Sequence, residues 1–218
     1  MIKKEDAMAL ISKIKSTHDS VDYNIRDDVH TWGGRNLIYY TKNFFVTGNR
    51  DTGWTNSGSW TFSTDSEGFV VASKAQTGQT SNNIPSLYAN RIPVNIGDII
   101  VVSCWMKIEV LNNNEYKIPY IFEVYNSSGT RVQYQDVAPT AANSNKPTLI
   151  DNTWTYFYST HTVTASDAVT ASIRLSLFRN GTMAIKKVKL EKGNKPTDWS
   201  PAPEDIAYVN GTELVLLS

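Results

Sequence analysis

Apolar and polar residues alternate with a period near two through most of this chain, which is the pattern of β-strands with one buried face. The alternation predicts strands over residues 35–41, 59–64, 67–73, 86–94, 98–111, 115–125, 131–136, 153–163, 169–178 and 183–191. Glycine, asparagine, aspartate and serine cluster between these segments, as hairpin turns and loops require. No helical period interrupts the series, so we expect an all-β region folded as a two-sheet antiparallel sandwich.

The first 33 residues follow a different period. Their apolar positions recur every three or four residues, as in the seam of a coiled coil. The members of this seam are Ala7, Ile11, Ile14, His18, Val21 and Ile25. About three heptads is short for an isolated coiled coil, and His18 interrupts the apolar series. Two interpretations stay open: an amphipathic helix that packs on its own domain, or a short α-helical stalk through which copies of the chain oligomerise.

Residues 98–111 give the clearest separation of two strand faces. One face carries only apolar side chains and is predicted to be core: Ile100, Val102, Cys104, Met106, Ile108 and Val110. The other face places Trp105 and Lys107 close to Ser103 and Glu109. A tryptophan on this more polar face has two explanations, contact with a ligand or cover by a rim loop or the N-terminal helix, and the sequence leaves both open.

Two motifs bound the strand-rich region. GRNL occupies residues 34–37, and VKLEKGNKPTDWSPAPED occupies residues 188–205. The second motif is a strand-like run that stops at a Gly193-Asn194 turn, after which Trp199 and three prolines favour an extended exit. Together the motifs resemble the boundary motifs of carbohydrate-binding-module-like jelly rolls in tail, baseplate and fibre proteins of phages that infect Gram-positive bacteria. The resemblance implies a jelly roll over 34–205, preceded by a stalk (1–33) and followed by a tail (206–218).

The same alternation directs a second set of residues away from the core in the strands 115–125 and 169–178. If these outward faces belong to one concave sheet, six residues line a single saccharide-contact groove: Trp105, Lys107, Glu123, Tyr125, Arg174 and Phe178. Sugar rings stack on aromatic side chains through their C–H faces. Their hydroxyls accept hydrogen bonds from basic side chains and donate hydrogen bonds to carboxylates. This mixture of residue types therefore suits a saccharide.

Other aromatic residues and histidines have less definite predicted roles. Trp54 and Trp60 are either loop anchors or part of a rim platform, Trp154 is predicted to be core, and Trp199 is predicted to pack on the domain as a closing residue. His161 is either a ligand contact or a hydrogen-bonded sheet residue. The resemblance also implies that a structural calcium ion could bind near Glu191 or Asp198, although no EF-hand loop surrounds them; no other cofactor is expected.

Composition narrows the possible chemistry. Lys plus Arg and Asp plus Glu both total 21, so no net charge favours nucleic acid or an anionic membrane as partner. Cys104 is the only cysteine, which excludes an intrachain disulfide and a cysteine-based zinc site. The sequence has no GxSxG, P-loop or HExxH motif, and Glu109 and Glu123 are the only strand-borne carboxylate pair that a glycosidase could use. We therefore expect no enzyme.

The resemblance implies a phage virion accessory protein, in a baseplate, tail fibre or neck/head appendage, that binds host cell-wall polysaccharide for adsorption. Its other expected partners are further virion proteins and copies of the same chain, with a trimer favoured. No apolar run reaches membrane-spanning length and the amino terminus lacks a signal-peptide core, so we expect assembly into the virion in the host cytoplasm. The alternative is a structural decoration or bridging protein without sugar binding, in which Trp105 would be covered.

Overall fold

The computed structural model describes residues 34–39, 41, 44, 48, 50, 53–80, 84–109, 120–137, 153–177, 179–202, 206–209 and 213–216. All regular structure within these residues is β, which confirms the predicted fold class for this part of the chain. None of the described residues forms a helix long and apolar enough to cross a membrane. The predicted stalk and its seam, Ala7, Ile11, Ile14, His18, Val21 and Ile25, lie outside the described residues.

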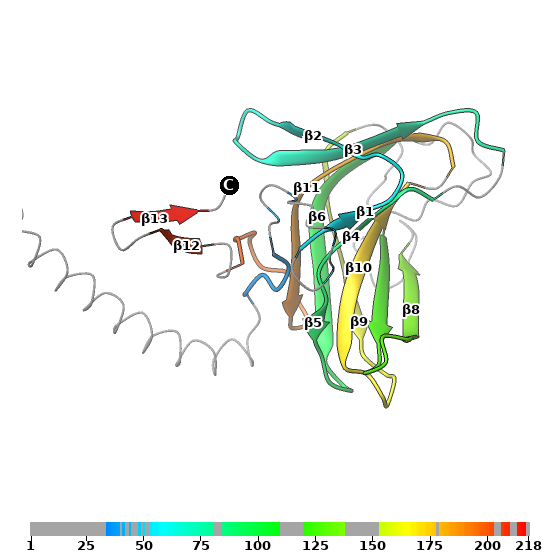
Figure 1. Ribbon diagram of the computed structural model, residues 1–218, viewed down its shortest axis with the longest axis vertical. Coiled ribbons are helices and arrows are strands. Elements are labelled where there is room, and N and C mark those ends of the chain that lie inside the picture. Colours follow the sequence, from blue (N-terminus) through cyan, green and yellow to red (C-terminus); the bar gives the residue numbers. More distant parts are fainter. Residues whose placement is uncertain are drawn as a thin grey trace, which may run out of the picture.

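The strands form two antiparallel sheets that pack face to face (Figure 1). The first, called the β7 sheet, has the order β1-β4-β10-β7-β8, with β5 also paired to β10. Its strands are β1 (Thr55–Asn56), β4 (Ser86–Tyr88), β5 (Ile92–Pro93), β7 (Tyr120–Tyr125), β8 (Arg131–Val137) and β10 (Thr170–Ser176). The second, called the β6 sheet, has the order β2-β3-β11-β6-β9. Its strands are β2 (Thr61–Thr64), β3 (Val70–Gln76), β6 (Ile99–Glu109), β9 (Thr155–Thr162) and β11 (Gly181–Lys192). A separate antiparallel pair consists of β12 (Ile206–Val209) and β13 (Glu213–Leu216).

The main strand pairs are nested along the sequence. β3 pairs with β11, β4 with β10, β6 with β9, and β7 with β8. The outermost strands in sequence are therefore neighbours, as when one long hairpin is rolled over itself. Successive pairs fall alternately in the β6 sheet and the β7 sheet, and the innermost pair, β7 with β8, closes the roll in the β7 sheet. This is the topology of a jelly roll.

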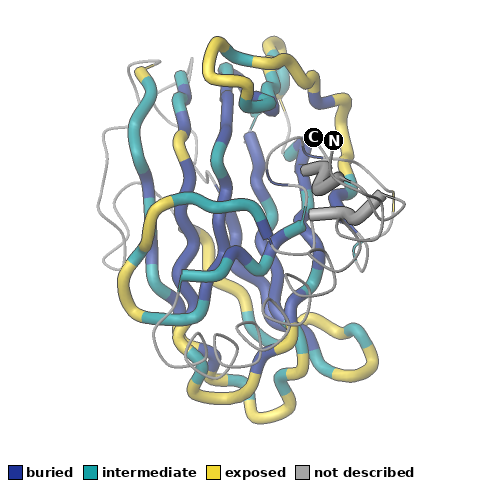
Figure 2. The backbone as a smooth tube through the Cα atoms, turned by 90° about the vertical axis from the view of Figure 1, so that its left-hand side faces the viewer, coloured by how far each residue is buried: buried dark blue, intermediate teal, exposed yellow. Residues whose placement is uncertain are grey.

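The core lies between the two sheets, and strand alternation explains which residues enter it. The predicted inner face of β6 is confirmed, because Ile100, Val102, Cys104 and Met106 are fully buried. The inner faces of β7 and β10 contribute Tyr120, Phe122, Val124, Ala171, Ile173 and Leu175 to the same cluster. Burial follows the strands, and exposed residues gather in the connecting turns (Figure 2). Alternation over 169–178 would place Val169 with Ala171 and Ile173 in the core, but it is 45% exposed, because it lies just before β10.

A β-bulge in β11 changes the parity that the sequence suggests. The register to β6 runs from Lys186 opposite Trp105 to Lys189 opposite Ser103, so β11 has one residue more than its partner over this step. Lys187, inside the bulge, has φ 52°. Strict alternation along the sequence predicts that Lys186 shares a face with Val188. That prediction was wrong, because the extra residue places Lys186 on the same outward face as Lys189.

The two boundary motifs meet across the end of the sandwich. Asn36 is fully buried, and its Nδ2 donates to the carbonyls of Val188 (3.2 Å) and Ser200 (3.1 Å). Its Oδ1 accepts from the backbone N–H of Leu190 (3.3 Å). Trp199 donates from Nε1 to the carbonyl of Val188 (3.2 Å) and packs edge-on against Phe69. The predicted closing role of Trp199 is confirmed, since the segment that carries Trp199 and Ser200 is fixed to β11 beside the GRNL segment.

Candidate functional site

The structure distributes the predicted groove residues over both sheets. Trp105 and Lys107 lie on the outward face of β6, while Glu123 and Tyr125 lie on β7 and Arg174 lies on β10. Phe178 lies outside the described residues. The outward faces of two packed sheets are opposite surfaces of a sandwich, so these residues do not line a single groove. Alternation identifies the residues that share one face of a strand, but it does not say which sheet the strand joins.

Glu123 is the centre of a polar cluster on the outward side of the β7 sheet. The residue is 2% exposed, yet both carboxylate oxygens have donors. Arg131 donates from Nη1 to Oε1 at 2.8 Å, and the Tyr125 hydroxyl donates to Oε2 at 2.6 Å. Arg50 reaches the same Oε2 from Nη2 (3.5 Å) and donates from Nη1 to the Tyr125 oxygen (2.9 Å). A buried carboxylate thus holds two arginines and a tyrosine in place.

The cluster keeps Glu123 ionised. Burial by itself would raise the pKa of this carboxyl, but hydrogen bonds from Tyr125 and Arg131, together with the charges of Arg174 and Arg50, outweigh burial and lower the pKa. The pKa of Tyr125 is raised, first by burial and then by its hydrogen bond to Glu123. The phenol therefore remains a hydrogen-bond donor.

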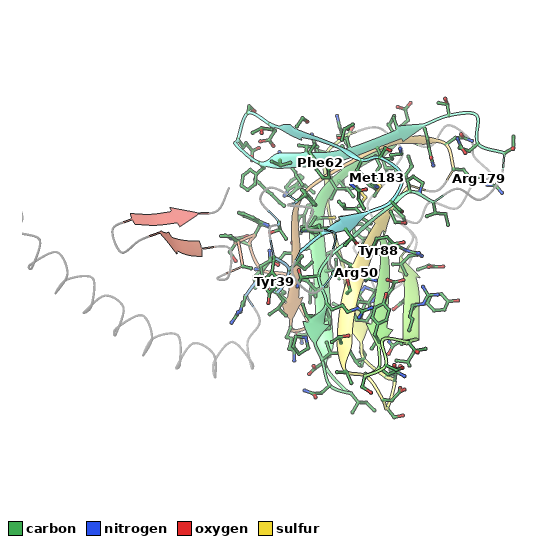
Figure 3. The ribbon with its side chains drawn as sticks, viewed as in Figure 1. Tyr39, Arg50, Phe62, Tyr88, Arg179 and Met183 are labelled. Carbon is green, nitrogen blue, oxygen red and sulfur yellow. The ribbon has the colours of Figure 1, made fainter. Side chains whose placement is uncertain are left out.

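Tyrosine rings and guanidinium groups stack over this face. Arg50 lies over the rings of both Tyr88 (4.9 Å to the centroid) and Tyr125 (5.2 Å), and Arg91 lies over Tyr125 at 4.5 Å. Arg174 lies 5.9 Å from the centroid of Tyr88. Figure 3 shows Arg50 and Tyr88 next to each other over the β4 and β10 region. Each ring thus positions a guanidinium by a cation–π contact, in addition to the bonds that Arg50 and Arg131 form with Glu123.

A third aromatic ring and a backbone hydrogen bond complete the surface, which we call the arginine–tyrosine face. It comprises Arg50, Tyr88, Arg91, Glu123, Tyr125, Arg131, Tyr134 and Arg174. Tyr134 is 59% exposed, with the Arg131 guanidinium 4.6 Å from its centroid. The backbone N–H of Arg91 donates to the carbonyl of Arg50 (2.8 Å), which holds the segment carrying Arg50 against the sheet. The face therefore combines a solvent-accessible ring with fixed hydrogen-bond donors.

Sequence reasoning found Glu123, Tyr125 and Arg174 and missed the other members of this face. The predicted turn over 127–129 and the alternation of 131–136 could have placed Arg131 opposite Tyr125, which the register confirms. Arg50 lies between the predicted strands 35–41 and 59–64, and no local pattern connects it to β7.

The outward face of the β6 sheet carries a different aromatic surface. Trp105 is 37% exposed and lies 5.7 Å from Tyr156 on the neighbouring strand. Lys107 and Lys186 both contact the Trp154 ring, at 5.5 and 5.1 Å. The prediction that Trp154 belongs to the core was wrong, because Trp154 sits at the start of β9 on its outward side and is only partly buried.

The remaining aromatic candidates are structural. Trp54 is fully buried and donates from Nε1 to the carbonyl of Tyr39 (2.8 Å), and Trp60 is 6% exposed, so both anchor loops and neither forms a rim platform. His161 points into the core. Its Nε2 lies 2.7 Å from the Ser159 hydroxyl and its Nδ1 2.9 Å from Oε1 of Gln135. Of the two alternatives for His161, the structure supports the hydrogen-bonded sheet residue.

The residues suggested for calcium do not fit that ion. Glu191 is fully buried, and its two oxygens accept from the backbone N–H and the hydroxyl of Thr197, at 2.8 and 2.6 Å. The Lys189 ammonium lies 3.4 Å from Glu191 and donates to the carbonyl of Asp198 (2.7 Å). A lysine thus supplies the positive charge beside these groups. No group of three or more potential metal ligands occurs among the described residues.

The carboxylates considered for glycoside hydrolysis lie on different sheets. Glu109 ends β6 on its outward side, whereas Glu123 lies on the outward side of β7. They therefore do not face each other across a shared cleft, as the reaction would require.

Comparison with known proteins gives structural similarity at low sequence identity. No protein-family model and no curated protein sequence matches the chain. The chain is similar to a CBM4 module, with 15% identity, a TM-score of 0.42, and coverage of 70% of this chain and 98% of that one. It is also similar to the C-terminal family 22 carbohydrate-binding module of Clostridium thermocellum Xyn10B, with 14% identity, a TM-score of 0.42, and coverage of 76% and 99%. A third similarity is to the enzymatically active domain of tailspike protein 4 from bacteriophage CBA120, with 14% identity and a TM-score of 0.38. That match covers 70% of this chain and 22% of the tailspike chain.

Proposed function

We propose that this protein is a virion protein of a phage infecting Gram-positive bacteria, and that its jelly roll binds host cell-wall saccharide during adsorption. The observation that carries the proposal is the arginine–tyrosine face, where aromatic rings and fixed charged donors share one sheet surface. An exposed ring such as Tyr134 offers a surface for the C–H face of a sugar, and the guanidinium groups offer donors to its hydroxyls. The paired boundary motifs at 34–37 and 188–205 support the phage assignment.

The surface around Trp105 is a second candidate contact. Trp105 and Tyr156 form an aromatic pair beside Lys107 on the opposite sheet, so a saccharide could also stack there. The alternative of a purely structural virion protein requires Trp105 to be covered. Its 37% exposure speaks against that requirement.

The predicted stalk extends the proposal to assembly. An oligomer, with a trimer favoured, would present several weakly binding domains from one particle and raise their combined avidity. Light scattering of the full chain tests this part. A monomer at high concentration, unchanged by Ile14→Asp, would remove the stalk from the proposal.

Binding of the full chain to a glycan array and to purified Gram-positive cell walls tests the main proposal. Tyr134→Ala is expected to reduce binding about tenfold, because one stacked ring contributes on the order of 1 kcal/mol or more. Trp105→Ala tests the opposite sheet, and Tyr158→Ala, on the outward side of β9 beside Ser103, is a further variant of that sheet. Loss in Tyr134→Ala alone would assign the contact to the β7 sheet. Absence of binding to every glycan and to cell walls would overturn the proposal and leave the structural alternative.

A further inference from the structure

The arginine–tyrosine face carries more positive charge than its own carboxylates neutralise. Four guanidinium groups, those of Arg50, Arg91, Arg131 and Arg174, meet around Tyr88, Tyr125 and Glu123 among the described residues. Glu123 is the one carboxylate with which described arginines of this face form ion pairs. Asp136, on β8 opposite Ile121, is the nearest further carboxylate by strand register. Even with both acids ionised, arginines remain in excess.

This excess is local. The whole chain has equal numbers of basic and acidic residues, so the cluster is not part of a generally basic surface. The Trp105 surface provides a contrast, because Lys186 there pairs with Asp65 (2.5 Å) and lies 3.5 Å from Glu67. The charge of Lys186 is therefore compensated by the protein itself.

The arginines also keep unused hydrogen-bonding capacity. The Nε atoms of Arg50, Arg91 and Arg174 are inaccessible to solvent and have no hydrogen-bond partner among the described residues. A buried polar group without a partner is unfavourable, and the cation–π contacts satisfy none of these N–H groups. The arginine side chains themselves are only partly buried: Arg50 is 20% and Arg131 40% exposed, and Arg91 and Arg174 are also partly exposed. Their outer N–H groups can therefore reach a ligand.

We infer that the saccharide bound at this face carries an anionic oxygen group, a carboxylate, phosphate or sulfate. The inference rests on the proposed saccharide-binding function and names the chemical class of its ligand. Guanidinium groups match such oxyanions with two parallel hydrogen bonds, and these charge-assisted bonds are stronger than those to a neutral hydroxyl. Because the tyrosine rings already hold the guanidinium groups in place, little ordering of side chains opposes binding.

The test is a glycan array in which each acidic oligosaccharide is present beside its neutral parent, with uronates beside their methyl esters and phosphorylated or sulfated sugars beside the unmodified sugar. Calorimetry on the full chain then measures the best pair at 50 and 500 mM NaCl. We expect the acidic form to bind at least about tenfold more tightly, as a charged hydrogen bond implies, and its affinity to fall at high salt. The acidic sugar that shows both the tighter binding and the salt dependence identifies the anionic group.

Three variants connect the preference to this face. Arg174→Gln is expected to lose about tenfold or more in affinity for the acidic form and little for the neutral parent. Arg174→Lys keeps the charge but loses the planar fork, so it should retain part of the preference. Arg179→Gln is the matched control, since Arg179 lies far from Arg50 and Tyr88 (Figure 3) and its replacement changes the net charge equally.

The outcomes separate the inference from the function on which it rests. Equal binding of acidic and neutral forms, without salt dependence, would overturn the inference and leave saccharide binding intact. Equal losses in Arg174→Gln and Arg179→Gln would place any charge preference elsewhere and would also overturn it. Failure to bind any saccharide or cell wall would overturn both.

Discussion

Lys189 and Glu191 lie two residues apart on the outward side of β11, and both are almost completely buried, with Nζ 3.4 Å from Oε2. Residues 197 and 198, in the exit segment of the 188–205 motif, cover them, and Thr197 accepts a hydrogen bond from Lys189 (2.5 Å) while donating to Glu191 (2.6 Å). Burial lowers the pKa of Lys189, against the opposing effect of Glu191. The pair thus depends on the exit segment for its hydrogen bonds, and the exit segment depends on the pair for its position.

Removing one member of this pair should be far more damaging than removing both. Lys189→Met leaves Glu191 buried beside no ammonium group, so we expect the free energy of unfolding to fall by about 3–5 kcal/mol. The double variant Lys189→Met/Glu191→Leu should recover most of that loss, because no unpaired charge remains. Urea denaturation measures each value. Lys192→Met is the control on the same strand, since the partly exposed pair of Lys192 and Asp98 should contribute less than about 1 kcal/mol. A single variant as stable as the parent would contradict this account.

Asn36 should be among the most sensitive polar positions. It hydrogen-bonds to five partners: Thr41, Val188, Ser200, Ile38 and Leu190. Asn36→Ala leaves several buried groups unpaired, so we expect a loss of about 2–4 kcal/mol in the free energy of unfolding. Asn95→Ala, at an exposed turn, should change stability by less than about 0.5 kcal/mol. Similar melting temperatures for the two variants would show that the boundary motifs do not fasten the domain.

The buried His161 predicts a defined pH dependence. Burial lowers its pKa from 6.5 to about 3, so the folded protein keeps the imidazole neutral where the unfolded chain binds a proton. Stability should therefore fall as pH decreases below 6.5, by about 1.4 kcal/mol per pH unit from this group. His161→Gln should lack this slope between pH 6 and 5, although it is less stable at pH 7. Parallel stability curves for the two proteins across that interval would refute the assignment, because His18 and His30 are common to both.

Two glycines with the same backbone conformation allow a steric contact to be separated from strain. Gly58 and Gly68 have φ of 79° and 81°. A Cβ at Gly58 would lie 2.5 Å from Cβ of Pro85, whereas a Cβ at Gly68 would meet no atom within 4 Å. Gly68→Ala should cost about 1–2 kcal/mol from backbone strain alone. Gly58→Ala should cost clearly more, because the β1 and β4 region must shift. Thermal unfolding measures the stability of both variants. Equal losses of stability would show that Pro85 can move away at little cost in free energy.

The sequence alone predicted the local features of the fold. Alternation in residues 98–109 identified the inner face of β6, because the side chains of a strand must point alternately to its two sides. The turn clusters separated the strands, and the motifs that contain Asn36 and Trp199 marked the two segments that meet at the domain boundary. These features depend on residues near one another in the chain, or on motifs specific enough to be recognised in isolation.

Only the tertiary structure decided the arrangement of the candidate site. Trp105 and Glu123 both point away from the core, yet they lie on opposite surfaces of the sandwich. The sheet that a strand joins depends on pairing with distant segments, and the alternation within the strand does not reveal that pairing. The single extra residue after Lys186 reversed the parity of β11 for the same reason, since a bulge exists only relative to a partner strand. Arg50 joins Glu123 across 73 positions of the sequence. The contact between Arg50 and Glu123 therefore exists only because the tertiary packing places Arg50 over the β7 sheet.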